Sequence, residues 1–149
     1  MYLRLNGIEM CCDGTERWSD LLKRLPDGGA GALGVCIQGR TYSLAARVEE
    51  YAYARVLTYA DEEGRRIYER SLQFLFLTAA HRLYPEVHVR IQHSFGQGLY
   101  IVMEGLELDA EKVSGIEEEM RRLVRLNLPI KRVNVSTKDA AEYFARTGQ

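Results

Sequence analysis

Histidine and cysteine are the residue types in this chain that could bind a metal ion or move protons. His81 lies late in a predicted helix, whereas His88 and His93 lie five residues apart in a predicted strand. Alternation along that strand predicts that His88 and His93 point to opposite faces of a sheet. The histidines therefore predict surface or packing roles and no metal site.

The cysteines Cys11, Cys12 and Cys36 are odd in number and lack the CxxC spacing of a redox or zinc motif. This pattern predicts reduced thiols in a cytoplasmic protein. Neighbouring residues of a strand point to opposite faces, so at most one of Cys11 and Cys12 is expected to be exposed. We expect all three to serve mainly as core filling in strands.

A glycine-rich segment directly after His93, residues 94–98, is a candidate for contact with a ligand. Its glycines, among them Gly98, permit close backbone approach, and His93, Ser94 and Gln97 offer hydrogen-bond donors and acceptors. The alternative to ligand contact is that these residues form an ordinary hairpin turn, which their composition also fits.

The segment from Gly34 to Thr41 has the spacing of a phosphate-binding loop, with Arg40 in the place of the usual lysine. Such a loop must join a strand to the N-terminus of a helix, where backbone amides converge on the phosphate. Here VCIQ before the turn is typical of a strand, and TYSL follows as a second strand. The segment therefore predicts a β-hairpin with a turn at Gly39-Arg40.

Turn residues and changes of hydrophobic period divide the chain into elements that would position these side chains. The first part predicts the order ββαβ(β)β, a short helix capped by Thr15 and laid across a mixed sheet. The second part begins with a long helix capped by Asp61, in which Phe74, Phe76 and Leu77 are expected in the core. Then follow a hairpin, a helix, a strand over residues 130–135 and a last helix.

Charge and composition limit the partners that this chain can have. Its 149 residues are 46% hydrophobic and 28% charged, with a formal net charge of −1. Such a balance is typical of a folded domain and lacks the basic excess that predicts nucleic-acid binding. The longest apolar run, residues 74–80, is too short for a membrane span, and the amino terminus is no signal peptide. We expect two domains, residues 1–60 and 61–149.

Four segments, taken in order, resemble the first two domains of threonyl-tRNA synthetase. They are VCIQGRTYSL, LTYADEEG, RLYPEV and RLNLPIKRVNVSTKDAAEYF. The first lies in a part that resembles the TGS domain, a ubiquitin-like β-grasp fold. The second matches the junction after that domain, and the last two match the synthetase's second, editing domain. The resemblance implies an α+β chain. A TGS-like β-grasp domain over residues 1–60 is followed by an editing-domain-like α+β domain over residues 61–149, which is truncated at its C-terminal side.

The segment IQHSFGQGLY is more similar to a bacterial uridine-kinase-like nucleoside kinase, in which the same two domains precede a P-loop domain. The synthetase edits mischarged tRNA with a His-x-x-x-His pair on its long helix, and Arg70 and Phe74 occupy those positions here. The resemblance thus implies a lost editing site, with Arg70 and the adjacent Ser71 as candidates for binding an anion. A salt bridge from Arg70 to an acidic neighbour is the alternative.

These expectations favour a non-catalytic accessory or regulatory module in front of a nucleoside kinase. The chain itself would need no cofactor, whereas the parent kinase domain would use ATP and Mg²⁺ and would be the module's partner in the same chain. A standalone RNA-binding module of the TGS type is the first alternative, and an aminoacyl-tRNA editing hydrolase is the second. RNA or a small-molecule effector is expected as a further partner, and no membrane.

Overall fold

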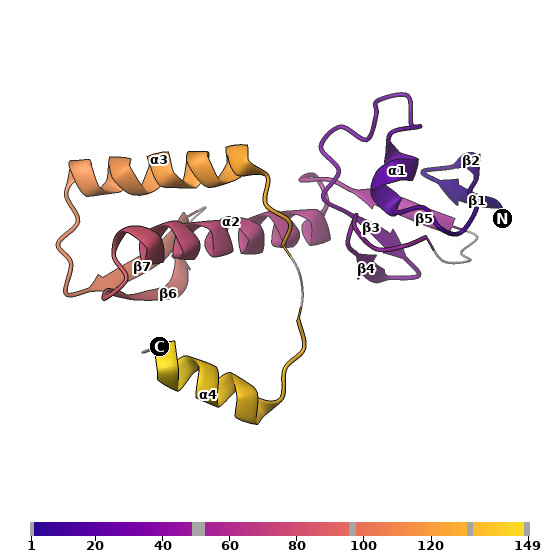
Figure 1. Ribbon diagram of the computed structural model, residues 1–149. Helices are drawn as coiled ribbons and strands as arrows, with labels where there is room; N and C mark the ends of the chain where they lie inside the picture. The colour runs from indigo at the N-terminus through magenta and orange to yellow at the C-terminus, as the bar shows by residue number, and fades with distance from the viewer. Residues whose placement is uncertain (1, 49–52, 96–97, 131–132, 148–149) are drawn as a thin grey trace. The chain divides into compact units, whose positions relative to one another are not determined.

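A computed structural model describes residues 2–48, 53–95, 98–130 and 133–147 (Figure 1). The chain divides into two compact units, Met1–Glu107 and Leu108–Gln149. The predicted domain boundary after residue 60 falls within the first unit and stays a prediction. Among the described residues, no helix combines the length and apolar character that crossing a bilayer requires.

The first unit begins with a five-stranded mixed sheet in the order β2-β1-β5-β3-β4. Strands β1 and β5 run parallel, and the other neighbours are antiparallel. This arrangement confirms the predicted α+β fold with a β-grasp sheet. The elements are β1 (Tyr2–Leu5), β2 (Ile8–Cys11), α1 (Trp18–Leu22), β3 (Gly34–Ile37), β4 (Arg40–Tyr42) and β5 (Tyr53–Leu57).

Two tight turns set the register of the antiparallel strands. Asn6 and Gly7 join β1 to β2, and Gln38 and Gly39 join β3 to β4, all four with positive φ. Two-residue turns of this kind match the right-handed twist of a hairpin. The second turn was predicted one residue later, at Gly39-Arg40, but Arg40 pairs with Ile37 and so opens β4.

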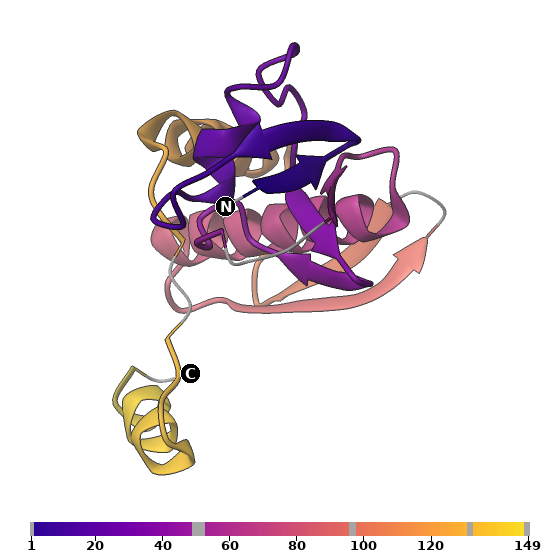
Figure 2. The same cartoon turned by 90° about the vertical axis from the view of Figure 1, so that its right-hand side faces the viewer.

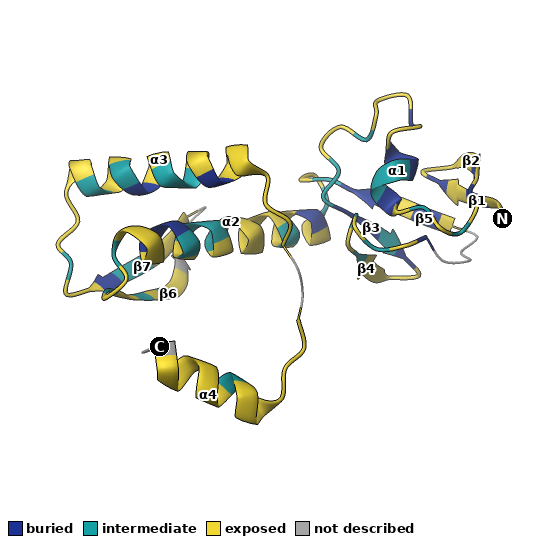
Figure 3. Ribbon diagram, viewed as in Figure 1, coloured by how far each residue is buried: buried dark blue, intermediate teal, exposed yellow. Residues whose placement is uncertain are grey.

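The main core lies between the sheet and α1, whose Trp18 and Leu21 are completely buried (Figure 3). The helix begins after Arg17, whose backbone N–H donates to Asp20 Oδ2 at 3.2 Å. The predicted cap at Thr15 was wrong, because the Thr15 hydroxyl donates instead to Asp13 at 2.7 Å. The loop before the helix is therefore two residues longer than predicted.

The rest of the first unit is a long helix beside a two-stranded hairpin (Figure 1, Figure 2). These elements are α2 (Glu62–Leu83), β6 (His88–Phe95) and β7 (Gly98–Glu104). The completely buried side chains of α2 are Ala79 and Ala80, which let neighbouring elements approach closely. The prediction that Phe74 and Leu77 fill the core was wrong: both are exposed, Phe74 to 55%, because small residues occupy the inward side of α2.

The second unit consists of α3 (Ala110–Leu126) and α4 (Thr137–Thr147). Asp109 caps α3 as predicted, accepting from the Lys112 backbone N–H at 2.8 Å. The strand predicted over residues 130–135 was wrong for the described part of that segment, where Ile130 and Val133 are each 73% exposed and form no strand. Alternation makes a segment able to form a strand, but pairing needs an edge to join. Residues 131 and 132 lie outside the described residues.

The turn between β5 and α2 is held by Thr58, Asp61 and Gly64. Asp61 occupies the position before the helix, as predicted, but its carboxylate accepts from the backbone N–H of Thr58 at 2.8 Å rather than from the helix. Arg55 donates to the same carboxylate. Gly64 lies so close to the Thr58 carbonyl that a Cβ would be 1.8 Å from its oxygen. The turn therefore requires glycine for space, not for conformation.

Gly64→Ala is expected to destabilise the first unit by roughly 1–3 kcal/mol, because the added methyl group must displace backbone. Gly115→Ala in α3 is the matched control, since a Cβ there meets nothing within 4 Å. It should stabilise its helix by about 1 kcal/mol, the usual difference between alanine and glycine. Urea unfolding followed by circular dichroism measures both. Equal effects of the two substitutions would contradict the close contact at Thr58.

The hydrogen bond from the Thr58 backbone lowers the pKa of Asp61, and Arg55 lowers it further. A lowered folded-state pKa contributes stability above the ordinary pKa, about 3.9, and that stability is lost as the pH falls through the folded value. Urea midpoints between pH 7 and about pH 3 should therefore fall less for Asp61→Asn than for the wild type. The fluorescence of Trp18, the single tryptophan, reports them. Parallel pH profiles would refute the assignment.

Candidate functional site

The outward side of α2 carries Arg70, Ser71 and Phe74, all exposed. The Ser71 hydroxyl donates to the Ile67 carbonyl at 2.7 Å, within its own helix. Arg70 and Phe74 lie one helical turn apart, the spacing at which two side chains share a face. A guanidinium and a phenyl ring provide neither a neutral base nor a metal ligand.

The hairpin β6–β7 carries the other predicted site residues, and its register contains a bulge. Ile91 pairs with Ile101 and Ser94 with Leu99, so Gln92 and His93 together face one residue, Tyr100. The His93 and Tyr100 rings stack, with centroids 5.3 Å apart and planes 25° from parallel. A bulge re-aims the side chains that follow it. It brings His93 onto the Tyr100 side of the hairpin.

The bulge also corrects the prediction that His88 and His93 lie on opposite faces. His88 pairs with Glu104, and residues 104 and 100 of β7 share a face because they are four apart in a strand. Since His93 stacks on Tyr100, both histidines lie on that face. Simple alternation failed because the extra residue in β6 reverses it.

The predicted loop at residues 94–98 is shorter in the structure, because β6 continues to Phe95 and β7 begins at Gly98. Gly98 pairs with Phe95 and is exposed, and the Ser94 backbone belongs to β6. Gln97 lies outside the described residues. No hydrogen bond, ion pair or ring contact between described residues joins Arg70 or Ser71 to His93. The role of these residues in ligand binding stays a prediction.

The described part of the chain contains no cluster of metal-binding side chains, and its cysteines are free thiols. No group of three histidine, cysteine, aspartate or glutamate residues there could hold a metal ion. Cys11 is exposed and Cys12 is buried, as alternation predicted, and Cys36 is half-buried. Burial raises the pKa of the Cys12 thiol, which keeps it protonated and poorly nucleophilic.

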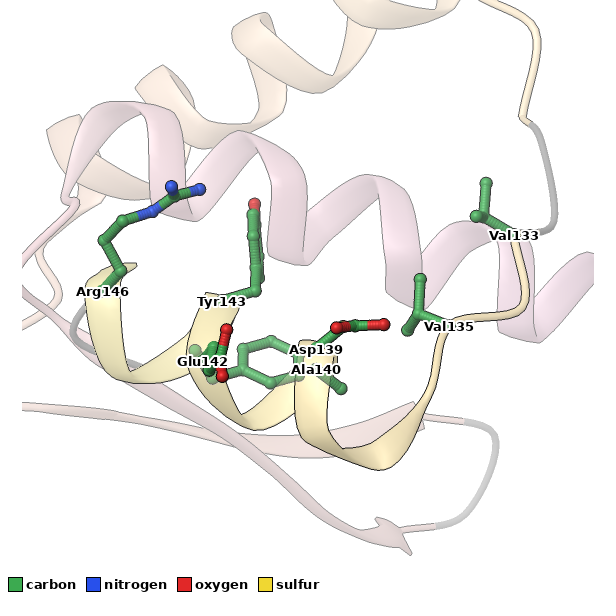
Figure 4. Close-up of a pocket in the computed structure, with 8 residues that line it drawn as sticks. Val133, Val135, Asp139, Ala140, Glu142, Tyr143 and Arg146 are labelled. Atoms are coloured by element: carbon green, nitrogen blue, oxygen red, sulfur yellow. The ribbon is translucent and has the colours of Figure 1, made fainter.

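A shallow hollow in the second unit was missed by sequence reasoning. Val133, Val135 and Tyr143 line it and point the same way from the extended segment and α4 (Figure 4). Asp139, Glu142 and Arg146 also line it, and Asp139 accepts from the Ser136 hydroxyl at 2.7 Å. The hollow thus combines apolar surface with charged side chains. Its signal in the sequence was the alternating valines, which were interpreted as part of a strand.

The sheet face opposite α1 was also missed. Residues paired across a sheet share a face, so Glu9, Arg4 and Tyr53 form one row across β2, β1 and β5. Arg4 Nε donates to Glu9 at 2.9 Å, and Arg4 Nη1 donates to the Tyr53 hydroxyl at 2.9 Å. Hydrophobic periodicity identified these strands by their buried residues and therefore passed over the exposed ones.

The fold and these sites define an α+β module with a β-grasp sheet. No family model matches the chain. Comparison with known proteins shows that this region is homologous to the N-terminal part of threonyl-tRNA synthetases, the TGS and editing region, at about 30% identity.

Three relatives illustrate the match. The threonine–tRNA ligase of Symbiobacterium thermophilum is 31% identical over 119 residues, which are 79% of this chain and 18% of the ligase. Threonine–tRNA ligase 2 of Bacillus subtilis is 31% identical over 111 residues, 74% of this chain and 17% of the ligase. The Finegoldia magna ligase is 27% identical over 139 residues, 92% of this chain and 22% of the ligase. The chain thus spans about a fifth of the length of these relatives.

The stacked pair on the hairpin predicts a measurable ring-current shift. In the wild type the His93 Hε1 proton should resonate upfield of its position in Tyr100→Leu, because the tyrosine ring shields it. His81, on α2, should keep its shift and serves as the internal control. Proton NMR of the histidine region measures both. An unchanged His93 resonance in the variant would show that the bulge does not bring the rings together.

Proposed function

We propose that this chain is a non-catalytic recognition module. The observation that supports it is the outward face of α2, where Arg70 and Phe74 stand at the positions of the synthetase's imidazole pair. Ser71, between them in the sequence, donates a hydrogen bond to the Ile67 carbonyl. Neither an arginine nor a phenylalanine side chain could act as a general base toward its hydroxyl. The chain is homologous to the TGS and editing region of the synthetases, and at the two aligned positions of α2 it carries no imidazole.

RNA is the partner that we propose first for this module. The relatives are threonine–tRNA ligases by name, so their own substrate is a tRNA. The module would then contribute recognition rather than hydrolysis. The intermixed charge of the chain implies that phosphate attraction supplies only part of the binding free energy.

A second candidate is an accessory module in front of the P-loop domain of a nucleoside kinase. The segment IQHSFGQGLY favours it, because this hairpin sequence is more similar to the kinase version than to the synthetase version. The kinase domain of such a parent would be the partner in the same chain and would bind ATP and Mg²⁺. This module would act on it by binding a small effector or by packing.

Hydrolysis of mischarged tRNA separates recognition from editing. The chain is expected to release no amino acid from seryl-tRNA-Thr above the spontaneous rate, because Arg70 and Phe74 stand where the synthetase has its imidazole pair. Arg70→His with Phe74→His restores two imidazoles one turn apart, and this variant is the matched test of whether the dyad alone is missing. Release of radiolabelled serine is the measurement. Turnover by the wild-type chain would overturn the proposal in favour of the editing hydrolase.

Phosphoryl transfer tests the second candidate. Neither ATP binding nor phosphorylation of uridine is expected from the chain by itself, since Gly34–Thr41 forms a hairpin and not a phosphate-binding loop. Isothermal titration with ATP and Mg²⁺ measures the binding, and uridine monophosphate formation measures the transfer. Kinase activity of this chain by itself would contradict a non-catalytic role.

A further inference from the structure

The open face of the β-grasp sheet presents planar side chains to solvent. Tyr2 is 82% exposed and Tyr53 62% exposed, and both lie on the face opposite α1. Arg4 lies between them in the sheet, because it follows Tyr2 in β1 by two residues and pairs with Tyr53 in β5. Arg55 continues the same face along β5. Four groups with flat π-surfaces therefore share one face of the sheet, on two neighbouring strands.

Three of these side chains, those of Arg4, Tyr53 and Arg55, are held in place before any partner arrives. The Arg4 guanidinium donates to the Tyr53 hydroxyl at 2.9 Å, and its carbon lies 5.7 Å from the centroid of the Tyr53 ring. Arg55 is fixed by its ion pair with Asp61. Fixed side chains lose less conformational entropy on binding, so the surface is preorganised.

Helix α2 covers only one end of this face. A Cβ on Gly34 would lie 3.0 Å from Ile67 of α2, and Leu57, which pairs with Gly34, is completely buried. Two residues back along β5, the Arg55 side chain is again about half exposed. The tyrosine and Arg4 side chains thus lie outside the part of the sheet that α2 covers, and Arg55 lies at its border, 3.9 Å from Glu63 of α2.

The charges of the face indicate how it would bind. Arg4 is paired with Glu9, and Arg55 with Asp61 and Glu63. Because each arginine has an acidic neighbour, the face provides little net attraction for a phosphate backbone. It provides ring and guanidinium planes, on which bases stack at a gain of about 1–3 kcal/mol per base.

We infer that this face, defined by Tyr2, Arg4, Tyr53 and Arg55, binds single-stranded RNA by stacking unpaired bases on its planar side chains. The inference rests on the RNA recognition proposed above and assigns it a site. Bases in a duplex are stacked on one another and are not available to such a surface. Binding therefore selects single strands, tolerates different base sequences and depends only weakly on salt.

Fluorescence anisotropy with the full chain and a labelled single-stranded RNA of about 8 nucleotides, a length within the usual site sizes, tests the inference. Tyr53→Leu should weaken binding about tenfold or more, the equivalent of one lost stacked base. Arg4→Lys keeps the charge but loses the plane, and it should weaken binding severalfold. Tyr100→Leu is the matched control, because Tyr100 is a similarly exposed strand tyrosine in the hairpin, and it should bind like the wild type.

The outcomes distinguish the site from the function. RNA binding that survives Tyr53→Leu and Arg4→Lys unchanged would overturn this site while RNA recognition stands. Absence of binding at low salt would overturn RNA recognition itself, and the site with it. Equal affinity for a duplex, or an affinity that falls steeply with salt, would show phosphate-driven binding and would overturn the stacking mechanism. Light scattering tests for self-association. A wild-type dimer that dissociates in the Tyr53→Leu variant would reassign the face to a second copy of the chain.

Discussion

The close contact of Gly64 with the Thr58 carbonyl is the constraint on which the geometry of the first unit depends. It allows α2 to begin within a few residues of β5, because a backbone without a Cβ can lie directly on the preceding turn. Asp61 then satisfies the Thr58 amide that the sharp turn leaves exposed. Gly64, which leaves room for the Thr58 carbonyl, and Asp61, which accepts from the Thr58 amide, thus fix where the long helix starts.

The buried residues of α2 are small and are not the residues of its candidate site. Gly64, Ala79 and Ala80 are buried, whereas Arg70 and Phe74 are exposed. The packing of α2 therefore does not depend on the side chains at the exposed positions. Such a scaffold can lose its catalytic groups without losing its packing, since fold and site depend on different residues.

Sequence reasoning succeeded where a structure is specified by neighbouring residues. The Asn6-Gly7 turn, the alternating β1 and the apolar side of α1 each have a local signal, so these elements were predictable. It failed where the outcome depends on a distant partner. The sequence of residues 130–135 alternates, but its described residues, 130 and 133–135, form no strand, and the bulge that brings His93 onto Tyr100 depends on the register of two strands. The candidate residues could be named, but their faces could not.

The two faces of the sheet differ in how much their side chains stabilise the fold. On the α1 side, Leu5 of the sheet and Trp18 of α1 stabilise it by leaving water, which requires only that they be apolar and fit together. On the opposite side, Tyr53 stays largely in water and is tied by its hydroxyl to Arg4, an arrangement that contributes little to folding. A side chain held in a fixed pose without being buried keeps its contact surface for another molecule. That difference is the physical reason to expect recognition at this face and stability from the other.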